Sequence, residues 1–261
     1  MFQSLRRIDA AMMEASGLMW RTALAFLALF ALCIVLSIAD ARLFQGVSLW
    51  LKPAKFFLSL SVHLMTVTAA LLLLTDKARR HWQVQTAAAV IVAMSVFEMV
   101  YIVFRAARGE ASHFNAASEI AGILYTAMGI GAVLILLGTA LIGWTVLRQG
   151  PATLLARTTG WAFLIAAAAG TWSGLAIGSM GSHWIGGDQT DATGIPLLGW
   201  STTGGDLRPA HFLGMHVMQI LPGVALAGSG RLVIAAGLAC AAGFAAAATL
   251  AFNGVPLFSY P

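Results

Sequence analysis

Residues 82–104 read WQVQTAAAVIVAMSVFEMVYIVF, an apolar stretch with a single charged side chain, Glu98. A helix of about 20 apolar residues is long enough to cross the hydrocarbon core of a bilayer. Because a charged group is costly to bury there, the stretch indicates a membrane-spanning helix that carries a functional residue.

Similar apolar runs recur along the whole chain of 261 residues, of which 59% are hydrophobic and 10% charged. Soluble domains carry roughly 25% charged residues, so the composition excludes a water-soluble enzyme. No run of Lys and Arg exceeds two residues, which excludes nucleic acid as a partner. We predict one all-α integral membrane domain over 1–261, with about seven transmembrane helices near 18–39, 54–75, 82–104, 121–145, 158–180, 210–228 and 231–253.

The basic residues between these runs predict the orientation, because cytoplasmic loops are enriched in Lys and Arg. We place the side with more Lys and Arg in the cytoplasm, which predicts a multi-pass protein of the cell inner membrane with the N-terminus inside and the C-terminus outside. The cytoplasmic side has nine basic residues: Arg6, Arg7, Arg21, Lys77, Arg79, Arg80, Arg148, Arg157 and Arg231. The outer side has six: Arg42, Lys52, Lys55, Arg105, Arg108 and Arg208.

Two segments outside the spans have distinct patterns. Hydrophobic residues recur at helical spacing in 1–17, which predicts an amphipathic helix on the membrane surface. Residues 181–209 form a long outward loop rich in Gly, with Trp184 and Trp200. A loop of this length is typical of a lid, of a docking surface for a membrane protein partner, or of a mobile segment.

Three of the runs carry polar residues on one helical face, which must point away from lipid. His63, Glu98 and His216 lie on these faces, roughly 9–14 Å from the outer helix ends, so we expect them to meet in one layer. Two imidazoles and a carboxylate are ligands for Zn or non-haem Fe, with Glu98 also able to act catalytically as a general base. His63 and His216 alone could instead ligate haem b.

Above this layer, Arg105 and Arg108 share a face that suits an anionic head group. The alternative is that these arginines extend to the interface and that a following Ser or Asn caps a helix. The predicted substrate or head-group residues are Lys55, Arg105, Arg108, His113, Asn115, Asp206, Arg208 and His211.

Small residues indicate where helices pack closely. Gly170, Gly174 and Gly178 are spaced by four, and without a hydrophobic effect between helices in lipid such rows allow backbones to approach. Packing within the chain is the first interpretation of this row, and a dimer face is the second.

These features favour a metal- or haem-dependent oxidoreductase acting on a lipid-soluble substrate, a quinone or a lipid. A zinc-type membrane hydrolase is the near variant. A proton-coupled transporter or ion path is the second class, with Glu98 and the histidines as proton carriers. A non-catalytic subunit or assembly factor of a membrane complex is the third. A buried ion pair of Glu98 with Lys55 or Arg105 is the structural alternative.

Overall fold

The computed structural model describes residues 2–115 and 117–259, with side chains from Gly17 onward in those ranges. The predicted amphipathic face of 1–17 therefore lies outside the described residues. Within them the chain forms eight helices, namely α1 (Phe2–Ala39), α2 (Leu51–Leu71), α3 (Asp76–Arg79), α4 (Trp82–Ala107), α5 (Glu119–Gln149), α6 (Leu154–Met180), α7 (Arg208–Ala225) and α8 (Gly230–Phe252).

Six of these helices are long and apolar enough to cross a membrane: α1 over Gly17–Ala39, and α2, α4, α5, α6 and α8. The all-α, multi-pass membrane fold predicted from the sequence is confirmed. The remaining predicted span, 210–228, is the helix α7, whose 18 residues include two histidines, Gln219 and Pro222. These residues lower its hydropathy, and a seventh crossing stays a prediction.

Side-chain caps set the starts of four helices. Thr75, Ser118, Thr153 and Ser229 each accept a hydrogen bond from a backbone N–H in the first turn of α3, α5, α6 and α8, respectively. These N–H groups have no partner within the helix, and the hydroxyls satisfy them at the membrane surface. Gly181 ends α6 in a left-handed conformation, with φ of 63°.

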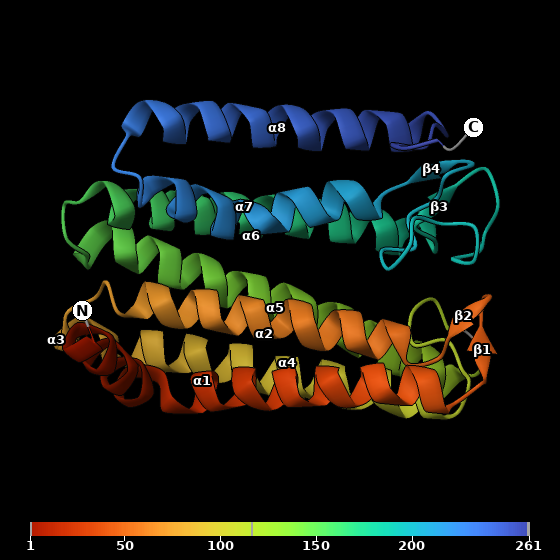
Figure 1. The fold of residues 1–261 in the computed structure, drawn as a ribbon, viewed down its shortest axis with the longest axis horizontal. Helices are drawn as coiled ribbons and strands as arrows, with labels where there is room; N and C mark the ends of the chain where they lie inside the picture. The colour runs from red at the N-terminus through yellow and green to blue at the C-terminus, as the bar shows by residue number, and fades with distance from the viewer. Residues whose placement is uncertain (1, 116, 260–261) are drawn as a thin grey trace.

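The helix α5 crosses the bundle diagonally between two groups of helices (Figure 1). One group holds α1, α2 and α4, and the other holds α6, α7 and α8. Glycines let α5 approach both, because a Cβ on Gly138 would lie 2.8 Å from Cγ1 of Ile91 in α4, and a Cβ on Gly143 would lie 2.6 Å from Cβ of Phe163 in α6. The helix α5 therefore joins the two halves.

The loops separate cleanly between the two ends of the bundle. One end, here the outer end, carries the hairpin of β1 (Leu43–Phe44) and β2 (Val47–Ser48), the α4–α5 loop, and the pair β3 (Trp184–Ile185) and β4 (Gly205–Asp206) (Figure 1). The other end carries α3 and the short α5–α6 and α7–α8 turns. This division matches the predicted pairing of loops, while the choice of the cytoplasmic side stays a prediction.

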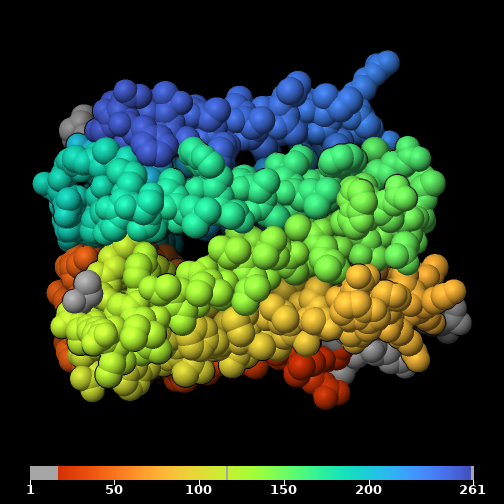
Figure 2. Space-filling model, turned by 180° about the vertical axis from the view of Figure 1, so that it is seen from behind, coloured from red at the N-terminus to blue at the C-terminus, as the bar shows by residue number. Residues whose placement is uncertain are grey.

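The predicted packing role within the chain is confirmed for Gly170, whereas a Cβ on Gly174 or Gly178 would have no neighbour closer than 3.8 Å. Gly170 lies directly against Met215 of α7, and its nearest α5 neighbour is Leu136. Farther toward the outer end α5 and α6 diverge, and the molecular surface is hollowed between them (Figure 2). The two halves are thus tightly joined in the middle and more open near the outer loops.

The orientation is tested by single cysteines at two exposed positions, Gln189 in the outer loop and Lys77 in α3. In intact cells, a membrane-impermeant maleimide should label Gln189→Cys and spare Lys77→Cys until the membrane is permeabilised. The native chain, with Cys33 and Cys240, gives the background. Labelling of Lys77→Cys alone in intact cells would show that the orientation is inverted.

Candidate functional site

One hydrogen bond fixes how α2 and α7 are aligned. Nε2 of Gln219 donates to Oγ1 of Thr66 over 3.2 Å. Both helices run inward from the outer end, so three residues back along each chain lie His216 and His63, about 4.5 Å farther outward. The two imidazoles are also near enough for charges on them to interact. His63 and His216 therefore occupy one layer, as the sequence predicts.

The proton position on His63 follows from its partner. Thr139 Oγ1 donates to the carbonyl of Ile135 over 2.9 Å, and His63 Nε2 lies 3.1 Å from the same hydroxyl. A hydroxyl has one hydrogen, so Nε2 must be the donor and the neutral ring carries its lone pair on Nδ1. That Nδ1 has no hydrogen-bond partner among the described residues.

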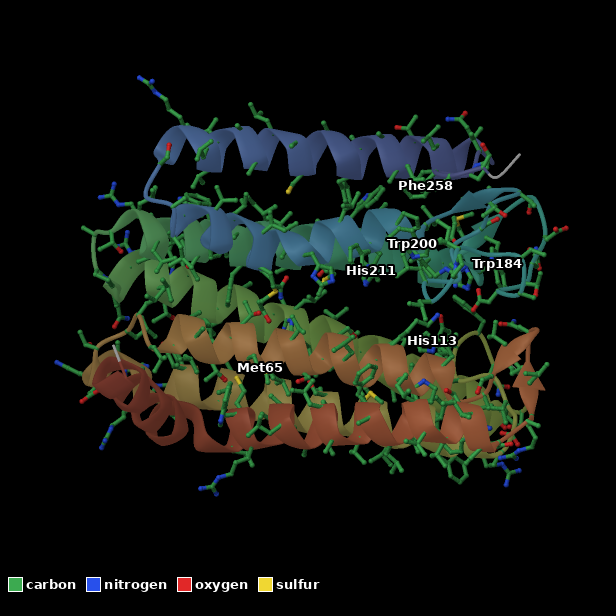
Figure 3. The ribbon with its side chains drawn as sticks, in the orientation of Figure 1. Met65, His113, Trp184, Trp200, His211 and Phe258 are labelled. Carbon is green, nitrogen blue, oxygen red and sulfur yellow. The ribbon has the colours of Figure 1, made fainter. Side chains whose placement is uncertain are left out.

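His211 is held in the same way from the other half. Ser173 Oγ donates to the carbonyl of Ala169 over 2.7 Å and lies 2.9 Å from Nδ1 of His211. Nδ1 is therefore the donor, and Nε2 carries the lone pair. The sequence placed His211 with the head-group residues, but in the structure its ring is held inside the bundle by α6 (Figure 3 labels His211).

We call the facing sides of α2 and α7, with His63 and His216, the histidine seam. Across the described parts of both helices, direct backbone packing between α2 and α7 is slight, because each packs mainly on other helices. The seam therefore places the free lone pair of His63 between the two halves of the bundle.

Glu98 does not join this layer. Its Oε1 lies 3.6 Å from the position of a Cβ on Gly131 of α5, eight residues before Thr139. Eight residues of helix span about 12 Å, so Glu98 lies well outward of His63. The physical reason is that Glu98 faces α5 rather than α7. Over residues 2–115 and 117–259, no group of three His, Cys, Asp or Glu side chains could hold a metal ion.

The arginines at the end of α4 are paired rather than free. Arg105 contacts Glu110, and Arg108 Nε donates to Glu110 Oε1 over 2.8 Å. Both cations lower the pKa of Glu110. Asn115 donates to the carbonyl of Ala111 and accepts from the N–H of Ala117. Glu110 therefore occupies the two arginines that were expected to bind an anionic head group, and the hydrogen bonds of Asn115 order the turn.

The long loop is tied to the start of α7 by Arg208. Its Nη1 lies 2.8 Å from Oδ1 of Asp191, and its Nη2 lies 2.7 Å from Oδ2 of Asp206. The guanidinium carbon lies 5.5 Å from the ring centroid of Trp184, a cation–π contact. Trp184 is buried by this packing, and the predicted residues Asp206 and Arg208 order the loop.

A cationic cluster lies beside this tie, formed by Lys52, Lys55 and Arg208 with His113 and His183 (Figure 3 labels His113 and Trp184 at its edges). Lys55 Nζ donates to the carbonyl of Leu198 over 3.2 Å, and Lys52 has no hydrogen-bond partner in the described part of the chain. Burial and the nearby Lys52 hold the pKa of His113 well below its usual value.

The charges of this outer cationic cluster do not balance. Asp191 and Asp206 offset two of the three cations of Lys52, Lys55 and Arg208, and one positive charge remains. The indole N–H of Trp184 is buried there without a partner among the described residues. A partly buried cation needs a counter-charge, so the cluster is suited to an anionic head group. Lys52 and Trp184 were not predicted as site residues, and the signal for Lys52 was its place on the polar face with Lys55.

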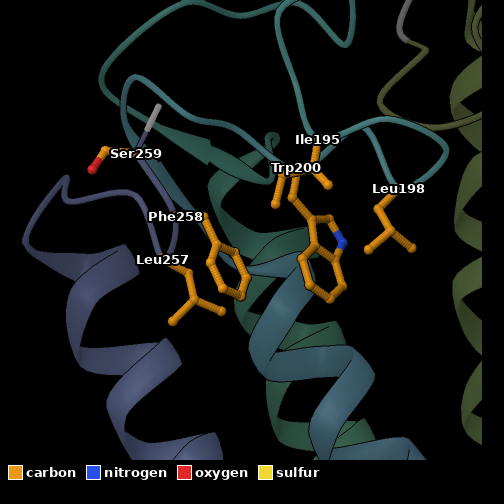
Figure 4. A pocket seen from close by; sticks show the side chains of 6 residues that line it. All are labelled: Ile195, Leu198, Trp200, Leu257, Phe258 and Ser259. Carbon is orange, nitrogen blue, oxygen red and sulfur yellow. The ribbon is translucent and has the colours of Figure 1, made fainter. Parts of the chain in front are cut away.

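An aromatic row connects the seam to the surface. Trp200 lies with Phe258 in an open hollow of about 570 Å³ (Figure 4). The ring of Trp200 is 5.5 Å from that of Phe212, which is 4.1 Å from the imidazole of His216. This row gives an apolar approach from the outer rim to the histidines.

Comparisons with known protein families, with curated proteins and with solved structures found no match to this chain.

The outer cluster predicts a loss of stability in acid. Burial and Arg208 lower the pKa of His183 from 6.5 to about 3. Between these two pKa values the unfolded chain binds a proton at His183 that the folded chain does not. The contribution of His183 to the free energy of unfolding is therefore fully present above the pKa of the unfolded chain, and it is lost as the pH falls below that pKa. From pH 7.5 to 5.5 we expect the Tm to fall by about 2–4 °C on account of His183.

Thermal unfolding in detergent measures this loss. His183→Asn should reduce the decrease in Tm, and His81→Asn, at an exposed position, should leave it unchanged. An equal decrease in the His183 variant and the native chain would contradict the assignment.

Proposed function

We propose that this protein is a membrane oxidoreductase that acts on a lipid-soluble substrate of the quinol class and holds a haem b or transition metal between His63 and His216. The observation that carries the proposal is the layer shared by the two imidazoles, one from each half of the bundle. Metal-bound histidines commonly donate their second ring nitrogen to a fixed acceptor. Thr139 is such an acceptor for His63.

The donor set favours haem b over zinc. A catalytic zinc takes three protein ligands, whereas Glu98 lies about 12 Å outward of His63. A haem needs only one or two protein ligands, and the imidazoles of His63 and His216, the first with a free lone pair on Nδ1, fit that requirement. Bound there, haem would supply one-electron transfer, while Thr139 would hold the His63 ring in place.

The surroundings of the seam support a lipid-soluble substrate. Trp200 and Phe212 give an apolar approach to His216, so a substrate could enter from the membrane rather than from water. A quinol presents hydroxyl donors, which match the acceptor nitrogen on His211. The outer cationic cluster would hold an anionic group of a substrate or neighbouring lipid.

A visible spectrum and metal analysis of the purified protein test the proposal. We expect a Soret band, or bound iron, in the native protein. His63→Ala and His216→Ala should each lower the amount of haem or metal bound per protein by at least about tenfold, because removing a ligand leaves too few protein bonds to retain the group. His81→Ala, at an exposed position, is the matched control. A native protein that is well folded, and that contains neither haem nor metal, contradicts the cofactor proposal.

The outer cationic cluster gives a separate prediction. Lys52→Gln should weaken binding of phosphatidylglycerol to the purified protein in nanodiscs by about tenfold, because a charge-assisted hydrogen bond contributes roughly 1.5–3 kcal/mol. Lys77→Gln removes the same charge from an exposed position at the other end and should change binding little. Equal effects of the two variants in nanodiscs would indicate only general attraction of the basic chain to anionic lipid.

A further inference from the structure

A second polar row follows the face of α4 that turns away from lipid. Ser95, Glu98, Tyr101 and Arg105 succeed one another at intervals of three or four residues. Ser95 is fully buried, and Glu98 and Tyr101 are 6% and 5% exposed. Each member has a polar atom that is buried and has no partner in the described residues: Ser95 Oγ, Glu98 Oε1, Tyr101 OH and Arg105 Nε.

Contacts with α5 fix where the row begins and ends. The neighbour of Glu98 on α5 is Gly131, and that of Ile91 is Gly138. Because the helices are antiparallel, Ser95 lies level with the α5 turn that precedes Thr139, the partner of His63. At the outer end, Arg105 contacts Glu110, whose side chain is 31% exposed. The row thus leads from the neighbourhood of His63 to outer water.

No ion pair accounts for the buried carboxyl of Glu98. Arg105 is engaged by Glu110, and Lys55 donates to the carbonyl of Leu198. These were the two cations that the sequence offered as partners. Buried polar atoms in native proteins are nearly always hydrogen-bonded, and ordered water is the usual partner where protein groups are missing. Tyr101 and Arg105 lie within reach of each other. Ser95 Oγ and Glu98 Oε1 have no protein partner in the described residues, and ordered water between α4 and α5 would supply the missing bonds.

We propose that this row is a proton relay, in which ordered water links Ser95, Glu98 and Tyr101 and opens to the outer face beside Arg105 and Glu110. Glu98 holds the moving proton. A water-borne proton forms an O–H bond with a Glu98 carboxylate oxygen, and the same bond breaks when the proton passes to the next water, so no electron moves. The neutral acid costs far less to bury than the charged form.

Infrared spectroscopy of the whole purified protein in nanodiscs tests the relay without any measurement of activity. The native protein should show the C=O band of a buried carboxylic acid, and transfer to D2O should shift that band within seconds. Glu98→Gln should remove the band, and Glu119→Gln, at an exposed position, should leave it. A missing band, as for a carboxylate bound to a cation, or a band that resists exchange for hours, overturns the proposal.

Gly131→Ala provides a variant that leaves every member of the row intact. The added methyl group would lie 3.6 Å from Oε1 of Glu98, an ordinary van der Waals contact that the fold should accept. If water occupies this space, the band should remain and its exchange should slow by at least about tenfold, because the methyl group takes the place of the linking water. Unchanged exchange would overturn the relay. Glu98→Gln should keep any cofactor spectrum, so this test and that of the proposed cofactor can fail separately.

Discussion

The close approach of α5 to both of its neighbours joins the two halves of the bundle. Gly138 admits Ile91 of α4, and Gly143 admits Phe163 of α6. Dispersion forces and polar contacts must hold helices together in lipid, and close backbone contact makes them effective. Because α5 crosses diagonally, it joins the halves firmly in the middle and lets them diverge toward the outer end (Figure 1). The histidine seam lies where the halves face each other.

Two hydroxyl groups, those of Thr139 and Ser173, fix the proton positions on His63 and His211. Thr139 and Ser173 each give their hydrogen to a carbonyl of their own helix, and each can then only accept from an imidazole. His63 and His211 are thereby fixed as neutral rings with one free lone pair. The acceptor nitrogen of His63 in the seam favours a metal centre, and that of His211 suits a ligand with hydroxyl donors. The proton relay on α4 is a separate device, since Glu98 faces α5 at another depth.

Apolar run length and polar periodicity were enough to predict the helices and the shared layer of His63 and His216. The same reasoning placed Glu98 in that layer wrongly, because periodicity defines a face but not which neighbouring helix the face meets. Periodicity also could not predict the ion pairs within the loops. Glu110 closes on Arg105, and Asp191 closes on Arg208 across the long loop. Such pairs depend on turn geometry and on which charges meet after folding.

A cryo-electron microscopy map of the protein purified from membranes tests the central claim most directly, because it shows what occupies the seam between His63 and His216. We expect density that joins Nδ1 of His63 to the imidazole of His216, with Thr139 on the opposite side of the His63 ring. A map in which α2 and α7 pack directly through apolar side chains, with the two imidazoles turned apart and nothing between them, would contradict it.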